Sequence, residues 1–86
     1  MSETPEIRFK RLRMRSWHRG TKEMDLILGP FADTDLAGLG PDDLDAYESM
    51  LEENDQDLYQ WVSGQRPAPE FHCRMIDLLR ARHGIG

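Results

Sequence analysis

Apolar residues recur at helical spacing in short runs, and this pattern limits the fold more than any other feature of the chain. The clearest run occupies positions i, i+3, i+4 and i+7 and consists of Met24, Ile27, Leu28 and Phe31. Residues at these positions share one face of a helix, which suits packing against a core. No segment shows the period-two alternation of a half-buried strand. The pattern therefore predicts an all-α fold.

Comparable runs occur in residues 6–17, between Pro41 and Leu51, around Trp61, and after Pro69. Glycine and proline residues separate these runs, as expected of helices joined by short connections. We therefore expect a small bundle of about five helices.

A chain of 86 residues has room for one domain. The whole range 1–86 is expected to form a single helical-bundle domain, with residues 1–5 and 84–86 as flexible ends. A chain this short removes only about 60–65% of its extended surface from water, so its core is modest and leaves no room for a large buried active site.

The chain also carries signals about its compartment. No apolar run approaches the roughly 18 residues of a membrane span, so we expect no membrane insertion. The polar, acidic first residues do not resemble a signal peptide. Cys73 is the only cysteine, which excludes an internal disulfide and a CxxC zinc pattern and suits a reducing compartment such as cytosol or organelle matrix.

Two local patterns predict where the second helix begins and ends. Gly20 is placed to cap its N-terminus, and Glu23, three residues later, is placed to complete a capping box. Pro30 has no N–H for the carbonyl of Leu26, so we expect the helix to kink or end there.

Charge is segregated along the chain, whose formal net charge is -5. Seven basic residues near the N-terminus have no acid among them: Arg8, Lys10, Arg11, Arg13, Arg15, Arg19 and Lys22. Residues 23–65 then contain twelve acids and no Lys or Arg. Such blocks fit an interaction surface, a fold whose oppositely charged halves attract each other, or ordinary solvated helix faces.

No familiar arrangement of catalytic or ligand-binding residues is present. His72 and Cys73 are adjacent and point about 100° apart on a helix, which does not suit a shared metal ion. Gly38 and Gly40 are not followed by the lysine of a phosphate-binding loop. We therefore expect no catalytic residue, no metal site and no stably bound cofactor.

The segment Arg19-Gly20-Thr21-Lys22-Glu23 lies where the basic block meets the acidic one. Helix capping alone explains its spacing. The same residues also suit contact with another protein: glycine allows close approach of a backbone, arginine offers a planar set of donors, and Glu23 offers a carboxylate. Spacing alone favours capping and leaves the second interpretation open.

Residues 15–25, RSWHRGTKEMD, resemble the RGxxE region of the succinate dehydrogenase assembly factor family, whose members are also called flavinators. The resemblance continues through residues 26–31, LILGPF, and Tyr47-Glu48. Residues 55–61, DQDLYQW, are similar to that family's D-x-D-L-x-x-W stretch. The resemblance as a whole spans roughly residues 8–82.

This resemblance implies a five-helix bundle that binds the flavoprotein subunit of succinate dehydrogenase, or of related fumarate reductases, and promotes covalent attachment of FAD to a histidine of that subunit. The family motif falls on Arg19, Gly20 and Glu23, and Arg15 and Asp25 are neighbours that we add to the partner-binding set. It further implies a factor that acts on its client's FAD, performs no reaction of its own, and works in the cytoplasm, or in the mitochondrial matrix of a eukaryote. A proton-transfer role for Glu23 is an alternative.

Other interpretations remain. A helix from Arg8 to Arg19 could bind nucleic acid, although the sequence pI near 5.0 argues against it and we expect no nucleic-acid partner. Residues 7–22 could form a mitochondrial targeting helix, against which Glu3 and Glu6 argue. Antitoxin-like binding to another small protein is the third alternative.

Overall fold

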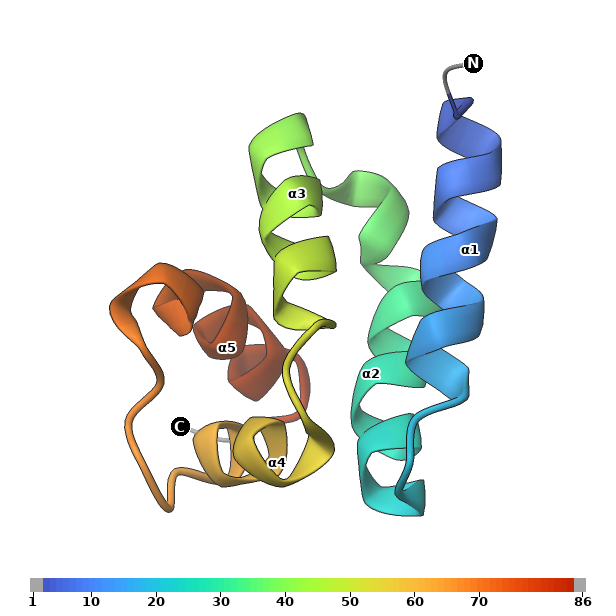
Figure 1. Ribbon diagram of the computed structural model, residues 1–86. Helices are drawn as coiled ribbons and strands as arrows, with labels where there is room; N and C mark the ends of the chain where they lie inside the picture. The colour runs from blue at the N-terminus through green and yellow to red at the C-terminus, as the bar shows by residue number, and fades with distance from the viewer. Residues whose placement is uncertain (1–2, 85–86) are drawn as a thin grey trace.

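A computed structural model describes residues 3–84 as an all-α chain (Figure 1). Its elements are α1 (Pro5–Trp17), α2 (Lys22–Thr34), a short 3-10 helix η1 (Leu36–Gly38), α3 (Pro41–Met50), α4 (Asp55–Ser63) and α5 (Glu70–Arg82). The described residues form no strand. The expected all-α bundle of about five helices is therefore confirmed.

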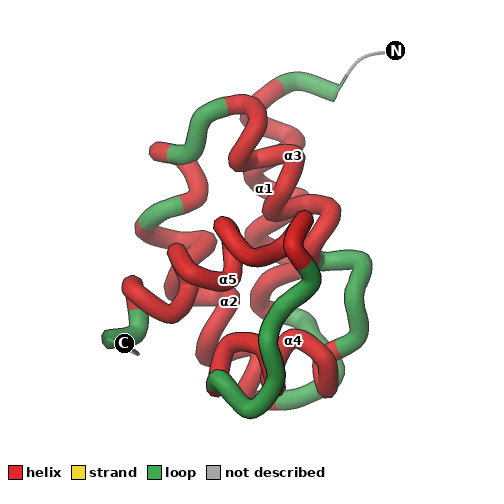
Figure 2. Tube along the Cα trace, turned by 90° about the vertical axis from the view of Figure 1, so that its left-hand side faces the viewer, coloured by secondary structure: helices red, strands yellow, loops and turns green. Residues whose placement is uncertain are grey.

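The helices pack around one hydrophobic cluster. α1 and α2 run antiparallel side by side, and α5 packs against α2, α3 and α4 (Figures 1 and 2). Every α-helix contributes buried side chains to the cluster; its fully buried members include Leu12, Leu28, Tyr47, Leu58 and Leu79. The apolar face read from the sequence of α2 is largely buried, since Met24, Leu28 and Phe31 are at most 1% exposed and Ile27 is partly buried.

The helix ends follow from ordinary capping chemistry. The side chain of Thr4 accepts a hydrogen bond from the Ile7 N–H at 3.2 Å and so caps α1. The side chain of Asn54 accepts one from the Asp57 N–H at 2.8 Å and so caps α4. Residues 1, 2, 85 and 86 lie outside the described residues, and flexible ends stay a prediction.

Helix α2 does not end at Pro30, contrary to one of the two expected outcomes. It continues to Thr34 with Pro30 inside it. Gly29 has no Cβ, which relieves the clash that a proline imposes on the residue before it. Leu26, whose carbonyl loses the proline N–H, is 54% exposed, so water can reach that side of the helix.

The two charged blocks of the sequence face each other. One side of α1 forms ion pairs with α3 and the loop after it: Arg8 with Asp45, Arg8 and Arg11 with Glu48, and Arg15 with Glu52. Arg19, in the turn after α1, pairs with Asp55, the first residue of α4. Burial of Glu48 acts to raise its pKa, but the hydrogen bonds from Arg11 and Arg8 outweigh it, and the net pKa is lowered. Attraction between the two halves thus accounts for much of the charge pattern.

Candidate functional site

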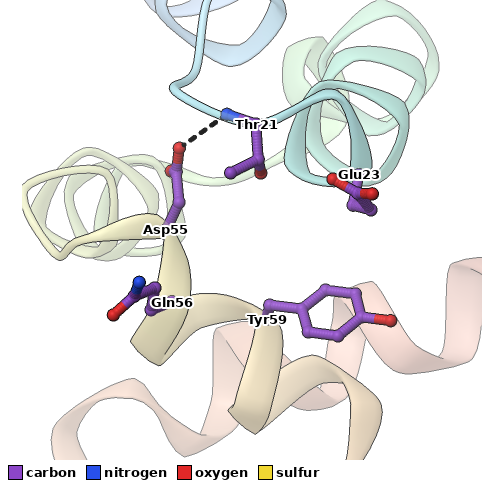
Figure 3. Close-up of a pocket in the computed structure, with 5 residues that line it drawn as sticks. All are labelled: Thr21, Glu23, Asp55, Gln56 and Tyr59. Atoms are coloured by element: carbon purple, nitrogen blue, oxygen red, sulfur yellow. Dashed lines mark hydrogen bonds between the residues drawn. The ribbon is translucent and has the colours of Figure 1, made fainter.

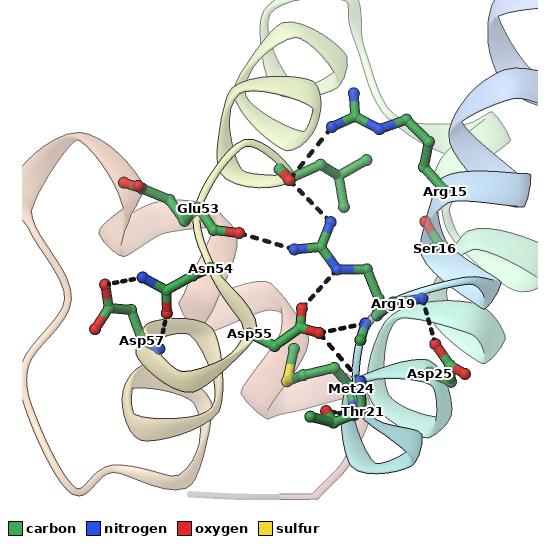
Figure 4. Close-up of polar contacts among 12 residues, drawn as sticks. Arg15, Ser16, Arg19, Thr21, Met24, Asp25, Glu53, Asn54, Asp55 and Asp57 are labelled. Carbon is green, nitrogen blue, oxygen red and sulfur yellow. Dashed lines mark hydrogen bonds and ion pairs between the residues drawn. The ribbon is translucent and has the colours of Figure 1, made fainter.

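The turn between α1 and α2 is anchored to the loop between α3 and α4 through Arg19 (Figure 4). Its Nε donates to Asp55 Oδ1 at 2.7 Å, and Nη1 and Nη2 donate to the carbonyls of Leu51 and Glu53, both at 2.8 Å. Only 10% of the Arg19 side chain is exposed. Each of its three nitrogens therefore has a partner within the chain.

Asp55 also accepts hydrogen bonds from the backbone of this turn. Its Oδ2 accepts the backbone N–H of Gly20 at 2.5 Å and that of Thr21 at 3.2 Å. A Cβ on Gly20 would lie 3.0 Å from the same oxygen, so the absence of a side chain allows this close contact. The Asp55 carboxylate, 12% exposed, thus binds residues 19–21, which precede it in the chain by 34 to 36 positions.

The expected N-cap is wrong by one residue. Thr21 caps α2, and its Oγ1 accepts the Met24 N–H at 3.3 Å. Glu23 is therefore the second residue of the helix and not the third, so the expected capping box with Gly20 does not form. The backbone N–H of Gly20 is bound to Asp55 instead, which the local sequence could not indicate.

Glu23 differs from its neighbours in having a free carboxylate. Among residues 3–84 it makes no ion pair or side-chain hydrogen bond, and it is exposed. It borders an open hollow of about 240 Å³, with Thr21 and Glu23 on the α2 side and Asp55, Gln56 and Tyr59 on the α4 side (Figure 3). Tyr59 is 40% exposed there. The hollow can accept a side chain from another molecule.

Of the two remaining predicted residues, Asp25 supports the same turn and Arg15 ties α1 to the loop between α3 and α4. Asp25 Oδ1 accepts the Arg19 backbone N–H at 2.6 Å. Arg15 pairs with Glu52 at 3.1 Å, and its Nη2 donates to the Leu51 carbonyl at 3.4 Å. A second hollow of about 280 Å³ is lined by Arg15, His18, Arg19, Gly20, Asn54 and Asp55.

All five predicted residues thus gather at one place. Whether they bind a partner stays a prediction. Sequence reasoning did not include Asp55, Gln56 and Tyr59 among the site residues, although all three lie in the D-x-D-L-x-x-W stretch. No local spacing relates that stretch to the turn, because the contact joins distant parts of the chain.

Below the turn, a buried polar pair ties α1 to α3. The hydroxyls of Ser16 and Tyr47 lie 2.7 Å apart, and both residues are fully buried. Burial raises the pKa of Tyr47 to about 12, although the hydrogen bond with Ser16 acts in the opposite direction. The phenol is therefore neutral at physiological pH.

The part of the chain that the structure describes shows neither a metal-binding cluster nor a membrane-spanning helix. Residues 3–84 contain no group of three or more His, Cys, Asp or Glu side chains placed to hold a metal ion. None of the helices formed by these residues is long and apolar enough to cross a membrane.

Comparison with known proteins links the chain to one family. The model of the family described as "Flavinator of succinate dehydrogenase" matches residues 10–83. A protein of Acetobacter pasteurianus named FAD assembly factor SdhE is 34% identical over 82 residues, which cover 90% of this chain and 75% of that relative.

Fungal proteins named succinate dehydrogenase assembly factor 2, mitochondrial, are also similar. The Schizosaccharomyces japonicus protein is 40% identical over 89 residues, covering 96% of this chain and 62% of its own length. The Mycosarcoma maydis protein is 37% identical over 68 residues, covering 79% and 29%. The chain thus spans less than two thirds of these fungal relatives.

Proposed function

This chain belongs to the succinate dehydrogenase flavinator family, and we propose that it is an assembly factor that promotes covalent attachment of FAD to a histidine of the flavoprotein subunit of succinate dehydrogenase. The observation that carries the proposal is the family match over residues 10–83, within which Arg19, Gly20 and Glu23 lie together at the α1–α2 turn and the start of α2. Fumarate reductase flavoproteins are a second client class to test.

We propose that the chain acts by shaping its client and not by a reaction of its own. Covalent attachment requires a client histidine nitrogen in line with the 8α-methyl carbon of the flavin, and a misplacement of about 1 Å can cost on the order of a hundredfold in rate. A small bundle that binds the client conformation with this alignment raises its population. The ion pairs between α1 and the α3 side support a rigid binding face.

The proposed client-binding face consists of Arg15, Arg19, Gly20, Glu23 and Asp25 around the α1–α2 turn. Glu23 is the member best placed for direct contact, because it is exposed and its carboxylate makes no bond within the described residues. Arg19, Gly20 and Asp25 hold the turn through contacts inside the chain, and Arg15 ties α1 to the loop between α3 and α4. FAD itself stays with the client, and we place the work in the cytoplasm, or in the matrix of a eukaryotic source.

Charge pairing favours a protein client over nucleic acid. Arg8, Arg11, Arg13, Arg15 and Arg19 on and after α1 all pair with acidic side chains of this chain. Few cations are thus left for phosphates, whose contacts dominate nucleic-acid affinity.

Binding of the purified flavoprotein subunit tests the proposal. We expect complex formation with the wild-type chain and weaker binding with Glu23→Ala. Asp42→Ala is a matched control, because Asp42 is also an exposed acid at the second position of a helix and also lacks an ion pair within the described residues. Equal binding by Glu23→Ala and the wild type would remove Glu23 from the interface. No complex with any client would leave an antitoxin-like partner as the better interpretation.

A further inference from the structure

We propose that Asp55 is a positioning residue for the client-binding turn, and that Arg19 affects the client through Asp55 and not by touching it. The inference rests on the function proposed above and names the group that holds its site in shape. Asp55 lies 30 residues or more from every residue of the turn, so it forms a separate half of the site.

The carboxylate of Asp55 uses both oxygens on the turn. Oδ1 accepts from Arg19 Nε, and Oδ2 accepts from the backbone N–H groups of Gly20 and Thr21 (Figure 4). Hydrogen bonds to an ionised acceptor are roughly twice as strong as neutral ones. Three of them on one carboxylate that is 12% exposed fix the path of the backbone through residues 19–21.

This anchoring extends to Glu23 through the start of α2. Thr21 is the N-cap of that helix, and Glu23 is its second residue. Holding the Thr21 N–H therefore sets where α2 begins and which way Glu23 points. Asp55 is also the first residue of α4, the helix that carries Gln56 and Tyr59. One side chain thus sets the separation between the two walls of the hollow in Figure 3.

Arg19 has little freedom to bind a client directly. Its side chain is 10% exposed, and its nitrogens donate to Asp55 and to the carbonyls of Leu51 and Glu53. Turning it toward a client would break its bonds to Asp55 Oδ1 and to both carbonyls, and would leave the Glu53 carbonyl without its donor. Losing a hydrogen bond to a charged group inside a protein is costly.

A double-mutant cycle separates positioning from direct contact. The measured quantity is the concentration of chain that gives half-maximal flavinylation of the purified flavoprotein subunit with FAD. We expect Arg19→Gln and Asp55→Asn each to raise it roughly tenfold or more. The half-maximal concentration of the double variant should not exceed that of the more damaging single variant, because both changes break the same Arg19–Asp55 contact. Multiplying effects would show that Arg19 acts on the client independently of Asp55, which would overturn the proposal that it acts through Asp55.

Asp57→Asn is the matched control on the same helix. Asp57 lies two residues on, bonds to Asn54 and Arg66, and does not contact the turn. It should keep the wild-type half-maximal concentration. If Asp57→Asn raised the half-maximal concentration as much as Asp55→Asn does, any change at the start of α4 would impair flavinylation, which would contradict positioning by Asp55. Should Asp55→Asn not fold, Asp55→Glu keeps the charge but lengthens the side chain, and we expect an intermediate value; a wild-type value would count against positioning.

The amide resonance of Gly20 provides a readout that does not depend on the client. It should move in Asp55→Asn and stay in place in Asp57→Asn and Glu23→Gln. An unmoved Gly20 amide in folded Asp55→Asn would overturn the anchoring. If the wild-type chain fails to raise flavinylation, the proposed function fails and the client role of Asp55 with it, while the Gly20 resonance still reports the contact.

Discussion

Arg19 Nε and Asp55 Oδ1 lie 2.7 Å apart and form the most buried Arg–carboxylate pair among residues 3–84, although 36 positions separate the two residues in the sequence. The other ion pairs between α1 and the acidic half are more exposed. The Arg19–Asp55 pair is therefore the most buried of a series of ion pairs, and it lies at the turn that we propose contacts the client.

Removing the Arg19 side chain should destabilise the fold. Arg19→Ala leaves a nearly buried carboxylate without its cation, removes the donor of the Glu53 carbonyl and leaves the Leu51 carbonyl with only the longer bond from Arg15, so we expect the free energy of unfolding to fall by about 2–4 kcal/mol. Urea unfolding measures this change. Arg66→Ala breaks an exposed pair with Asp57 and should cost less than about 1 kcal/mol. Equal costs for the two variants would contradict the assigned burial.

Gly29 should tolerate no side chain. A Cβ there would lie 2.5 Å from Cε2 and Cε3 of Trp17, whose indole N–H donates to Asp33 at 3.2 Å. Gly29→Ala should therefore displace the indole and lower the free energy of unfolding by about 1–3 kcal/mol, with a change in tryptophan fluorescence. Gly38→Ala is the control, because no atom lies within 4 Å of its Cβ position, and it should leave both measurements unchanged.

A side chain on Gly20 should disturb the turn more than the core. In Gly20→Ala the new Cβ would lie 3.0 Å from Asp55 Oδ2, so the carboxylate must shift. We expect a loss of about 1 kcal/mol in unfolding free energy and weaker client binding. Gly40→Ala, at an open position, should keep client binding at the wild-type level. Wild-type binding by Gly20→Ala would argue that the close contact is not needed.

Ionisation of Tyr47 should lower the stability of the fold at high pH. Its pKa is raised from 10.0 to about 12 in the folded chain, so below pH 10 the phenol is neutral in both states and its contribution is fully present. Between pH 10 and 12 the unfolded state ionises first, and about 2 kcal/mol of stability should be lost. Urea unfolding of the wild type and Tyr47→Phe checks this, because the variant lacks this part of the pH dependence. A constant difference between them across that range would contradict the assignment.

The sequence predicted the helices well where the apolar periodicity is local. Met24, Leu28 and Phe31 lie on the buried face that their spacing indicated. Gly64 ends α4 in the left-handed conformation, with φ at 85°, as expected of a C-terminal glycine. Both features depend on residues within one or two turns of each other.

The site was only half predictable. The motif placed Arg19, Gly20 and Glu23 together, but Thr21 caps α2, because its side-chain oxygen accepts the Met24 N–H and Gly20 has no side chain to do so. The Gly20 N–H is bound by a distant carboxylate. Pairing of Arg19 with Asp55, and not with another of the twelve acids of residues 23–65, depends on how the α3–α4 loop returns to the turn. Local sequence patterns contain no information about that return.

Covalent flavin on the client tests the central claim most directly. The purified flavoprotein subunit, free of covalent flavin, is incubated with FAD with and without the chain, and flavin fluorescence of the denatured subunit is read in a gel. The account predicts a clear rise in the fluorescent band when the wild-type chain is present. Equal fluorescence with and without the chain, in a client shown to be folded, would contradict it.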